Sequence, residues 1–151
     1  RGGKAIGSLP VQSQKIPSSA SALPAGVTGA QILAEAQKYI SCPYRAGGSS
    51  PSGFDCAGLV YYVLNQLGLA PYRSPADQYK MGTPVDKSSL TPGDLVFFRL
   101  TSGGSISHVG IYAGNGQFLH APNSRSPVSY SSLTEGYWAE HYYGACRLAS
   151  S

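Results

Sequence analysis

The chain has 151 residues, of which 42% are apolar and only 12% charged, so it is long enough for one domain with a hydrophobic core and a tail. Its formal charge of +4 is unevenly placed, because residues 1–29 carry three basic and no acidic side chains while the remaining residues carry eight basic and seven acidic ones. A folded part with a charge of only +1 excludes the basic patch that nucleic-acid binding requires, and no apolar run reaches the roughly 20 residues needed to cross a bilayer.

Residues 1–29 are predicted to form a flexible linker that precedes a single domain over residues 30–151. The linker is rich in Ser, Gly, Pro and Ala, contains no aromatic residue and shows no sustained hydrophobic period. Such a segment cannot bury enough apolar surface to offset its conformational entropy. Its positive charges could make a weak contact with an anionic membrane or wall surface, although a solvated linker carries as many. No secretory leader is recognisable, so we expect any leader to precede residue 1.

A first helix is predicted to begin at Thr28 and to end at Pro43. Thr28 and Gln31 have the spacing of a capping box, in which each side chain satisfies an amide at the start of the helix. The residues that follow place apolar side chains at helical spacing, and Pro43 ends the helix. The predicted buried stripe consists of Ile32, Leu33, Ala36, Tyr39 and Ile40.

A second helix is predicted after a glycine-rich loop. If Asp55 caps this helix, Cys56 lies in its first turn, and Gly68 is suited to the position just after its last turn. Residues 69–92 are predicted to be mostly loop, with one helical turn around residues 76–81. The apolar stripe of the second helix consists of Leu59, Val60, Val63, Leu64 and Leu67.

From residue 94 onward the pattern predicts strands. Residues 94–98 have the pattern of a buried strand, and residues 108–112 and 117–121 flank the turn-forming Gly114-Asn115-Gly116 as in a hairpin. Residues 128–130 and 142–148 are predicted to supply further strands. Because the helices come first and an antiparallel sheet follows, the predicted fold class is α+β.

Cys56 is the first candidate for chemistry. At the start of a helix the amides have no intrahelical partner, so they favour a thiolate and could also hold an oxyanion. Gly58 in the same turn is expected to leave room for a peptide substrate. The alternative is that Cys56 is a buried structural thiol, as most free cysteines are.

Two histidines in the predicted hairpin are the next candidates. Strand alternation puts His108 on one face with Gly110, and a loop centred on Gly114 would place His108 directly opposite His120. One imidazole could then act as a general base while the other orients it. A loop centred on Asn115 and Gly116 would break this register, and two half-buried histidines that satisfy backbone carbonyls are the alternative.

Three segments of the chain resemble the signature segments of the NlpC-type bacterial cell-wall cysteine peptidases. They are FDCAGLV at residues 54–60, LTPGDLVFF at 90–98 and SHVGIYAGNG at 107–116, in the family's order and spacing. The resemblance covers roughly residues 30–148. It implies a papain-like core in which N-terminal helices pack on a five- or six-stranded antiparallel sheet. It also implies that Cys56 is the nucleophile, His108 the base and His120 the third polar residue.

The resemblance extends to an oxyanion and substrate-binding set. Tyr44 matches a tyrosine whose hydroxyl lies beside the nucleophile, although it could equally pack against the first helix. Asp55 precedes the nucleophile, and Arg73 and Ser74, together with Gln78, resemble a segment that lines the substrate groove. Arg73 could pair with a substrate carboxylate or be an ordinary exposed arginine. One departure is Ala57, where the family usually has Ser.

The function that the resemblance implies is peptidoglycan hydrolysis through an acyl-enzyme, without a metal or cofactor. The bond is expected to join γ-D-glutamate to the diamino acid of the stem peptide, or D-alanine to diaminopimelate in a cross-bridge. The protein is expected to be a monomer exported to the bacterial periplasm or envelope, where the linker could anchor it. The alternatives are a related Cys/His amidase or acyltransferase, a zinc site and a non-catalytic wall-binding module.

Two further cysteines leave one question open. Cys42 ends the first predicted helix and Cys146 lies in the last predicted strand. In an exported protein they could form a disulfide, or they could be two unrelated buried thiols. The remaining histidine, His141, is given no role.

Overall fold

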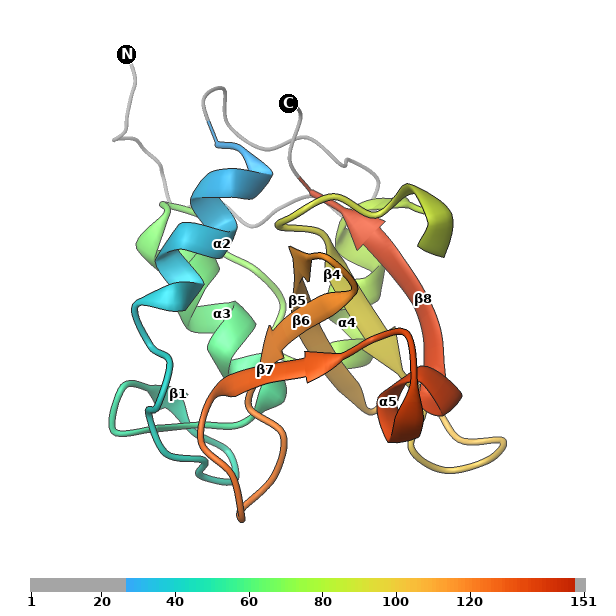
Figure 1. Cartoon of the computed structure of the whole chain (residues 1–151). Coiled ribbons are helices and arrows are strands. Elements are labelled where there is room, and N and C mark those ends of the chain that lie inside the picture. Colours follow the sequence, from blue (N-terminus) through green and yellow to red (C-terminus); the bar gives the residue numbers. More distant parts are fainter. Residues whose placement is uncertain (1–26, 149–151) are drawn as a thin grey trace.

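The computed structural model describes residues 27–148 (Figure 1). Residues 1–26 of the predicted linker lie outside the described part, so the prediction of a flexible linker stays a prediction. Within residues 27–148, no helix combines the length and the apolar character that crossing a membrane requires.

The first helix, α2 (Gly29–Gln37), begins as predicted and ends earlier. The Thr28 hydroxyl accepts from the Gln31 amide and the Gln31 side chain accepts from the Thr28 amide, which confirms the capping box. The helix ends at Gln37 rather than near Pro43, because the chain turns away through Ser41, whose φ is 80°. The Ser41 amide donates to the carbonyl of Val128, so this turn is hydrogen-bonded to a segment much later in the chain.

The second helix, α3 (Cys56–Gln66), confirms the predicted cap and stop. Asp55 is the N-cap, and its carboxylate accepts from the Gly58 amide at 2.6 Å. Gly68 follows the helix with a φ of 89°, the left-handed conformation expected just after a helix end. The predicted helical turn is also present, as α4 (Pro75–Gln78) and the 3-10 turn η1 (Tyr79–Met81).

The predicted antiparallel sheet has six strands in the order β3-β8-β4-β5-β6-β7. With the preceding helices it confirms the α+β class. Its strands are β3 (Thr83–Pro84), β4 (Leu95–Phe98), β5 (His108–Gly114), β6 (Gln117–His120), β7 (Ser129–Ser132) and β8 (Tyr142–Arg147). The short strands β1 (Ser49–Ser50) and β2 (Gly53–Phe54) form a separate ribbon before α3, and η2 (Lys87–Ser89) and α5 (Gly136–His141) complete the elements.

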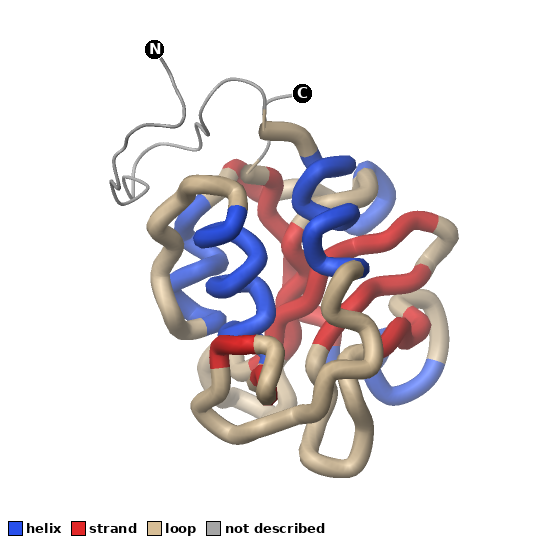
Figure 2. The backbone as a smooth tube through the Cα atoms, turned by 90° about the vertical axis from the view of Figure 1, so that its left-hand side faces the viewer, coloured by secondary structure: helices blue, strands red, loops and turns tan. Residues whose placement is uncertain are grey.

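The two faces of the sheet pack against different partners. Helices α2 and α3 lie together beside the sheet (Figures 1 and 2), where α3 packs against β5 in the main core. On the other face, Phe98 and Phe118 form a second cluster that Trp138 of α5 covers. The start of β5 therefore lies where the N-terminus of α3 meets the sheet, which positions the candidate site.

The register of the β5–β6 hairpin is the second of the two that the sequence left open. Ile111 pairs with Leu119 and Tyr112 with Phe118, so the hairpin is centred on Asn115 rather than on Gly114. The reason is the turn, in which Gly114, Asn115 and Gly116 all have positive φ values of 93°, 55° and 75°. His108 therefore does not lie directly opposite His120, as a loop centred on Gly114 would have placed it, and the two lie on a diagonal of the hairpin.

Candidate active site

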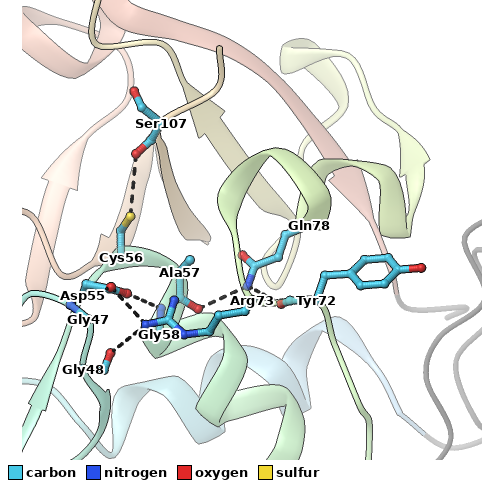
Figure 3. A network of polar contacts seen from close by, with 10 residues as sticks. All are labelled: Gly47, Gly48, Asp55, Cys56, Ala57, Gly58, Tyr72, Arg73, Gln78 and Ser107. Atoms are coloured by element: carbon cyan, nitrogen blue, oxygen red, sulfur yellow. Dashed lines mark hydrogen bonds and ion pairs between the residues drawn. The ribbon is translucent and has the colours of Figure 1, made fainter.

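Cys56 lies at the first position of α3, where the Asp55 carboxylate organises the surrounding loop (Figure 3). One carboxylate oxygen accepts from the Gly58 amide at 2.6 Å. The other accepts from the Gly47 amide at 3.1 Å and from the Arg73 guanidinium at 3.0 Å. Asp55 thus joins the helix start, the glycine-rich loop and the segment before α4, so its observed role is structural support of Cys56.

Two amides at the start of α3 are left without a backbone partner. The Gly58 amide donates to the Asp55 side chain and the Leu59 amide to the Asp55 carbonyl. Within residues 27–148, the amides of Cys56 and Ala57 take part in no such hydrogen bond. Unpaired amides at a helix N-terminus can hold a developing negative charge. This arrangement meets the chemical requirement that the sequence suggested for an oxyanion site.

The Cys56 sulfur lies close to the backbone of Ser107 and Val109, the two residues that flank His108 at the start of β5. The Sγ atom lies 3.9 Å from the Ser107 carbonyl oxygen, a weak contact that Figure 3 draws. Burial raises the pKa of the Cys56 thiol above its ordinary value, and the Asp55 carboxylate adds to this increase. The amides of Val109, Ala57 and Cys56 lower the pKa but do not outweigh burial. The amides at the helix start therefore favour the thiolate as expected, but burial, which the sequence could not account for, outweighs them and raises the pKa of the thiol.

His108 and His120 form a buried hydrogen-bonded pair. Their Nε2 and Nδ1 atoms, respectively, lie 2.7 Å apart, and the His120 Nε2 lies 2.8 Å from the Ser131 hydroxyl. Burial lowers the pKa of His108 to about 3, against an opposing effect of Asp55. Burial and then His108 lower the pKa of His120 to about 2. Both rings are therefore neutral near pH 7, and Nδ1 of His108 is the ring nitrogen that the pair leaves free.

Trp138 covers this pair. Its ring stacks on His108 with centroids 4.5 Å apart and meets the edge of His120 at 4.8 Å. The side chains of His108 and His120 are accordingly only 3% and 0% exposed. Sequence reasoning missed both Trp138 and Ser131. The only signal for Trp138 was a single tryptophan in an aromatic segment, and its contact with His108 requires the tertiary fold.

A groove of about 520 Å³ opens at the thiol and is lined by the four residues of the predicted oxyanion and substrate-binding set. Tyr44 is half-buried, and burial, with smaller electrostatic effects of Cys56 and Asp55, raises the pKa of its hydroxyl. The groove beside Cys56 is thus bordered by the Tyr44 hydroxyl, the Asp55–Arg73 ion pair and the Ser74 hydroxyl. The candidates in the lining are Tyr44, Asp55, Arg73 and Ser74, together with Cys56.

Arg73 and Ser74 already have partners within the chain. The Arg73 guanidinium donates to the Asp55 carboxylate at 3.0 Å and to the Gly48 carbonyl at 3.4 Å. It is therefore neither an ordinary exposed arginine nor a side chain left free for a substrate carboxylate. The Ser74 hydroxyl caps α4 by accepting from the Asp77 amide at 3.3 Å. These contacts hold the wall of the groove in place.

Two expectations about the groove are wrong. Gln78 is fully buried beneath it and donates to the carbonyls of Ala57 and Tyr72, which places it in the support of α3 rather than in the lining. Gly58 leaves no room for a substrate either, because a Cβ there would collide with the Gly48 carbonyl. Both residues serve the packing of the loop against α3.

The cysteines, all within the described part of the chain, are free thiols. Cys146 is buried, and its sulfur lies 3.8 Å from the Gln78 carbonyl oxygen. Cys42 and Cys146 are therefore two separate thiols and do not form the disulfide that the sequence left open. Among residues 27–148, no three His, Cys, Asp or Glu side chains are grouped as metal ligands would be. Another hollow of about 580 Å³ over β8 is lined largely by tyrosine and charged side chains and contains neither Cys nor His.

The sequence of this chain is similar to one known protein family and to curated members of it. A model described as the NlpC/P60 family matches residues 41–147. Murein DD-endopeptidase MepH of Escherichia coli is 44% identical over 115 residues, which cover 74% of this chain and 42% of that protein. Gamma-DL-glutamyl hydrolase of Bacillus subtilis is 47% identical over 119 residues, covering 78% and 29%. The chain therefore spans less than half the length of these curated relatives.

Solved structures agree with the fold. An NlpC/P60 family protein from Bacillus cereus superposes with a TM-score of 0.77 at 31% identity, covering 82% of this chain and 41% of that one. The NlpC/p60 domain of the peptidoglycan hydrolase SagA gives a TM-score of 0.71 at 38% identity, covering 80% and 99%. The second comparison is with a single domain of nearly the same extent.

Proposed function

Since this chain belongs to the NlpC/P60 family, we propose that residues 30–151 form a peptidoglycan endopeptidase in which Cys56 is the nucleophile and His108 the base. One observation carries the proposal. A thiol at the amide-lined start of a helix faces the segment of β5 that presents a neutral, hydrogen-bonded imidazole. A nucleophile, a base, an orienting group and oxyanion donors are what cysteine-dependent acyl transfer requires.

Acylation starts from the neutral pair. The thiol gives up its weak contact with the Ser107 carbonyl and passes its proton to Nδ1 of His108 as the sulfur attacks the amide carbonyl carbon. The carbonyl oxygen takes up negative charge, which the amides of Cys56 and Ala57 stabilise. The C–N bond breaks, His108 returns the proton to the leaving amine, and a thioester remains on Cys56.

Deacylation repeats these roles with water. His108 takes a proton from a water molecule as the oxygen attacks the thioester, and the C–S bond breaks as His108 returns the proton to the sulfur, which releases a carboxylic acid and the thiol. With Nδ1 of His108 as the base, the hydrogen bond between the two rings runs from Nε2 of His108 to Nδ1 of His120, which stabilises the imidazolium while it exists. The groove beside Cys56 accommodates the acyl part of the substrate against Tyr44, Asp55 and Arg73.

The substrate we propose is the stem peptide of peptidoglycan, and the location is outside the cytoplasm, in the envelope. Support comes from relatives that are named for two activities, a murein DD-endopeptidase and a gamma-DL-glutamyl hydrolase. The part of the predicted linker that precedes the Thr28 cap of α2 would hold the domain away from a surface, and its positive charges would favour an anionic one.

Digestion of purified muropeptides tests the proposal and identifies the bond. Mass spectrometry of the products distinguishes cleavage between γ-D-glutamate and the diamino acid from separation of a cross-linked dimer into monomers. We expect the wild type to cleave one of these bonds and Cys56→Ala to cleave neither. In water enriched in ¹⁸O, hydrolysis adds one label to the new carboxyl, whereas an acyltransferase adds none. Cleavage that survives iodoacetamide but not a chelator would contradict the cysteine mechanism.

A further inference from the structure

We infer that Ser131 is a positioning residue that fixes the tautomer of the His108–His120 pair and thereby makes Nδ1 of His108 the base. The observation is a hydrogen-bonded chain that runs across three strands. His108 of β5 contacts His120 of β6 at 2.7 Å, and His120 contacts the Ser131 hydroxyl of β7 at 2.8 Å. This inference rests on the proposed function, because it explains how the base of that reaction is kept ready.

A neutral imidazole carries one N–H group, so the chain has two arrangements. In the first, Nε2–H of His108 donates to Nδ1 of His120, and Nε2–H of His120 donates to the Ser131 hydroxyl. In the second, every hydrogen bond is reversed and Ser131 donates. Only the first leaves Nδ1 of His108 with a lone pair that can take the thiol proton. The second places a hydrogen there, and the pair is inactive.

The reaction itself selects the first arrangement. When His108 becomes an imidazolium, its Nε2 carries a hydrogen and must donate to His120. The first arrangement already has this direction, so no proton has to move along the chain. The second would require the proton on His120 Nδ1 to shift before each turnover, which the burial of both rings away from solvent does not assist.

Ser131 is what permits this arrangement. His120 is fully buried, so a hydrogen on its Nε2 needs an acceptor within the protein. Ser131 is half-buried and can accept from His120 while its own O–H points outward. Without the hydroxyl, a buried N–H group would be left unpaired, which is less tolerable than an unpaired acceptor. Removing the hydroxyl should therefore turn His120 to the Nδ1–H form and His108 to the inactive form.

The β6–β7 pairing places Ser131 for this contact. Ser131 pairs with Phe118, and His120 pairs with Ser129, so His120 reaches Ser131 along a diagonal of the two strands. Ser132 on the same strand offers a matched control, because its hydroxyl contacts Thr134 instead. Ser131→Thr retains a hydroxyl and Ser131→Ala removes it.

The test combines ¹⁵N NMR of the imidazole nitrogens with steady-state kinetics on the stem-peptide substrate. In the wild type we expect a protonated Nε2 on His120 and an unprotonated Nδ1 on His108. In Ser131→Ala the protonated nitrogen of His120 should become Nδ1, and kcat should fall about 10- to 100-fold with little change in KM. Ser131→Thr and Ser132→Ala should behave as the wild type does.

The inference is overturned if His120 Nε2 is unprotonated in the wild type. It is also overturned if Ser131→Ala changes kcat without changing the tautomer, or the tautomer without changing kcat. The NMR measurement needs no substrate. A wild type that has the expected tautomers but cleaves no muropeptide would therefore contradict the proposed function while leaving the hydrogen-bonded chain intact.

Discussion

His108 and His120 meet along a diagonal of the β5–β6 hairpin, with ring nitrogens 2.7 Å apart although neither residue lies opposite the other in the strand register. Gly110 makes this possible. A Cβ at that position would come within 2.6 Å of the Phe118 ring and 3.2 Å of the His120 Cβ. The absence of a side chain at 110 leaves space through which the two imidazoles approach each other.

Gly110→Ala should therefore disturb the site and the core together. We expect the free energy of unfolding to fall by about 1–3 kcal/mol, the usual cost of overpacking, and activity to fall as the His108–His120 contact lengthens. Urea denaturation and muropeptide cleavage provide the two measurements. Gly104→Ala is the comparison variant and should have a smaller effect, since the nearest atom to its Cβ, the Thr101 carbonyl oxygen, lies at 3.2 Å in a loop rather than at 2.6 Å in the core. A Gly110→Ala protein as stable and active as the wild type would refute this account of the hairpin.

Trp138 keeps water from the histidine pair, so its removal should change the pH dependence of activity. In Trp138→Ala the pKa of His108 should rise from about 3 toward its ordinary value, with Asp55 and His120 as the remaining influences. If it reaches about 6.5, kcat/KM at pH 5 falls roughly 30-fold relative to pH 8, because protonated His108 cannot accept the thiol proton. The wild type should change little over this range.

A pH profile between pH 5 and pH 8 measures this effect. Trp138→Phe retains an aromatic cover and should keep the wild-type profile, which separates the loss of cover from a general loss of packing. Equal profiles for Trp138→Ala and the wild type would mean that Trp138 does not set the protonation of His108.

The same buried histidines should make folding stability depend on pH. Their folded pKa values are lowered to about 3 and about 2, so the unfolded chain binds more protons wherever the pH lies below the ordinary histidine value. The contribution of these histidines to the free energy of unfolding is fully present above pH 6.5. It is lost as the pH falls from there toward 3, by about 1.4 kcal/mol per pH unit for each histidine. His120→Asn should lessen the slope, measured by urea denaturation at several pH values. His141→Asn is the control, and a wild-type stability that is constant from pH 7 to pH 5 would contradict the prediction.

An ion pair between the end of β8 and the residue before β4 provides a prediction on stability alone. Arg147 donates from Nε and Nη2 to the two carboxylate oxygens of Asp94 at 2.9 and 2.8 Å, and Asp94 is only 2% exposed. Arg147→Ala leaves this carboxylate buried without its partner and should cost about 3 kcal/mol, the lower end for a broken buried pair because Arg147 is itself partly exposed. Thermal or urea unfolding measures the loss. Arg125→Ala, in an exposed loop, should change stability by less than about 0.5 kcal/mol. A similar effect of both substitutions would show that the Asp94 contact contributes little.

The parts of the fold that sequence predicted are those that local interactions determine. The capping box at Thr28, the Asp55 cap before Cys56 and the glycine after α3 depend on residues within one helical turn. The resemblance to a known family supplied the pairing of distant segments around His108. Local reasoning alone left two hairpin registers open, because it could not fix how many residues the turn at Asn115 takes up.

The remainder of the site depends on tertiary packing. Burial reverses the expected pKa direction of Cys56, and burial follows from the complete core rather than from the cap. Trp138 and Ser131 reach His108 and His120 from α5 and β7, at positions with no motif to identify them. Gln78 illustrates the converse, since its segment suggested a groove residue and its side chain is buried below the groove.

The roles of Cys56, His108 and His120 are tested most directly by turnover of one defined stem-peptide substrate by three alanine variants, each checked for a native circular dichroism spectrum. The account predicts that Cys56→Ala and His108→Ala lose at least about 10⁴-fold in kcat/KM, because each removes a group that bonds to a reacting atom. His120→Ala should lose only about 10- to 100-fold, since His120 acts through His108. A nearly normal His108→Ala, beside a His120→Ala as inactive as Cys56→Ala, would contradict the account and assign the base to the other histidine.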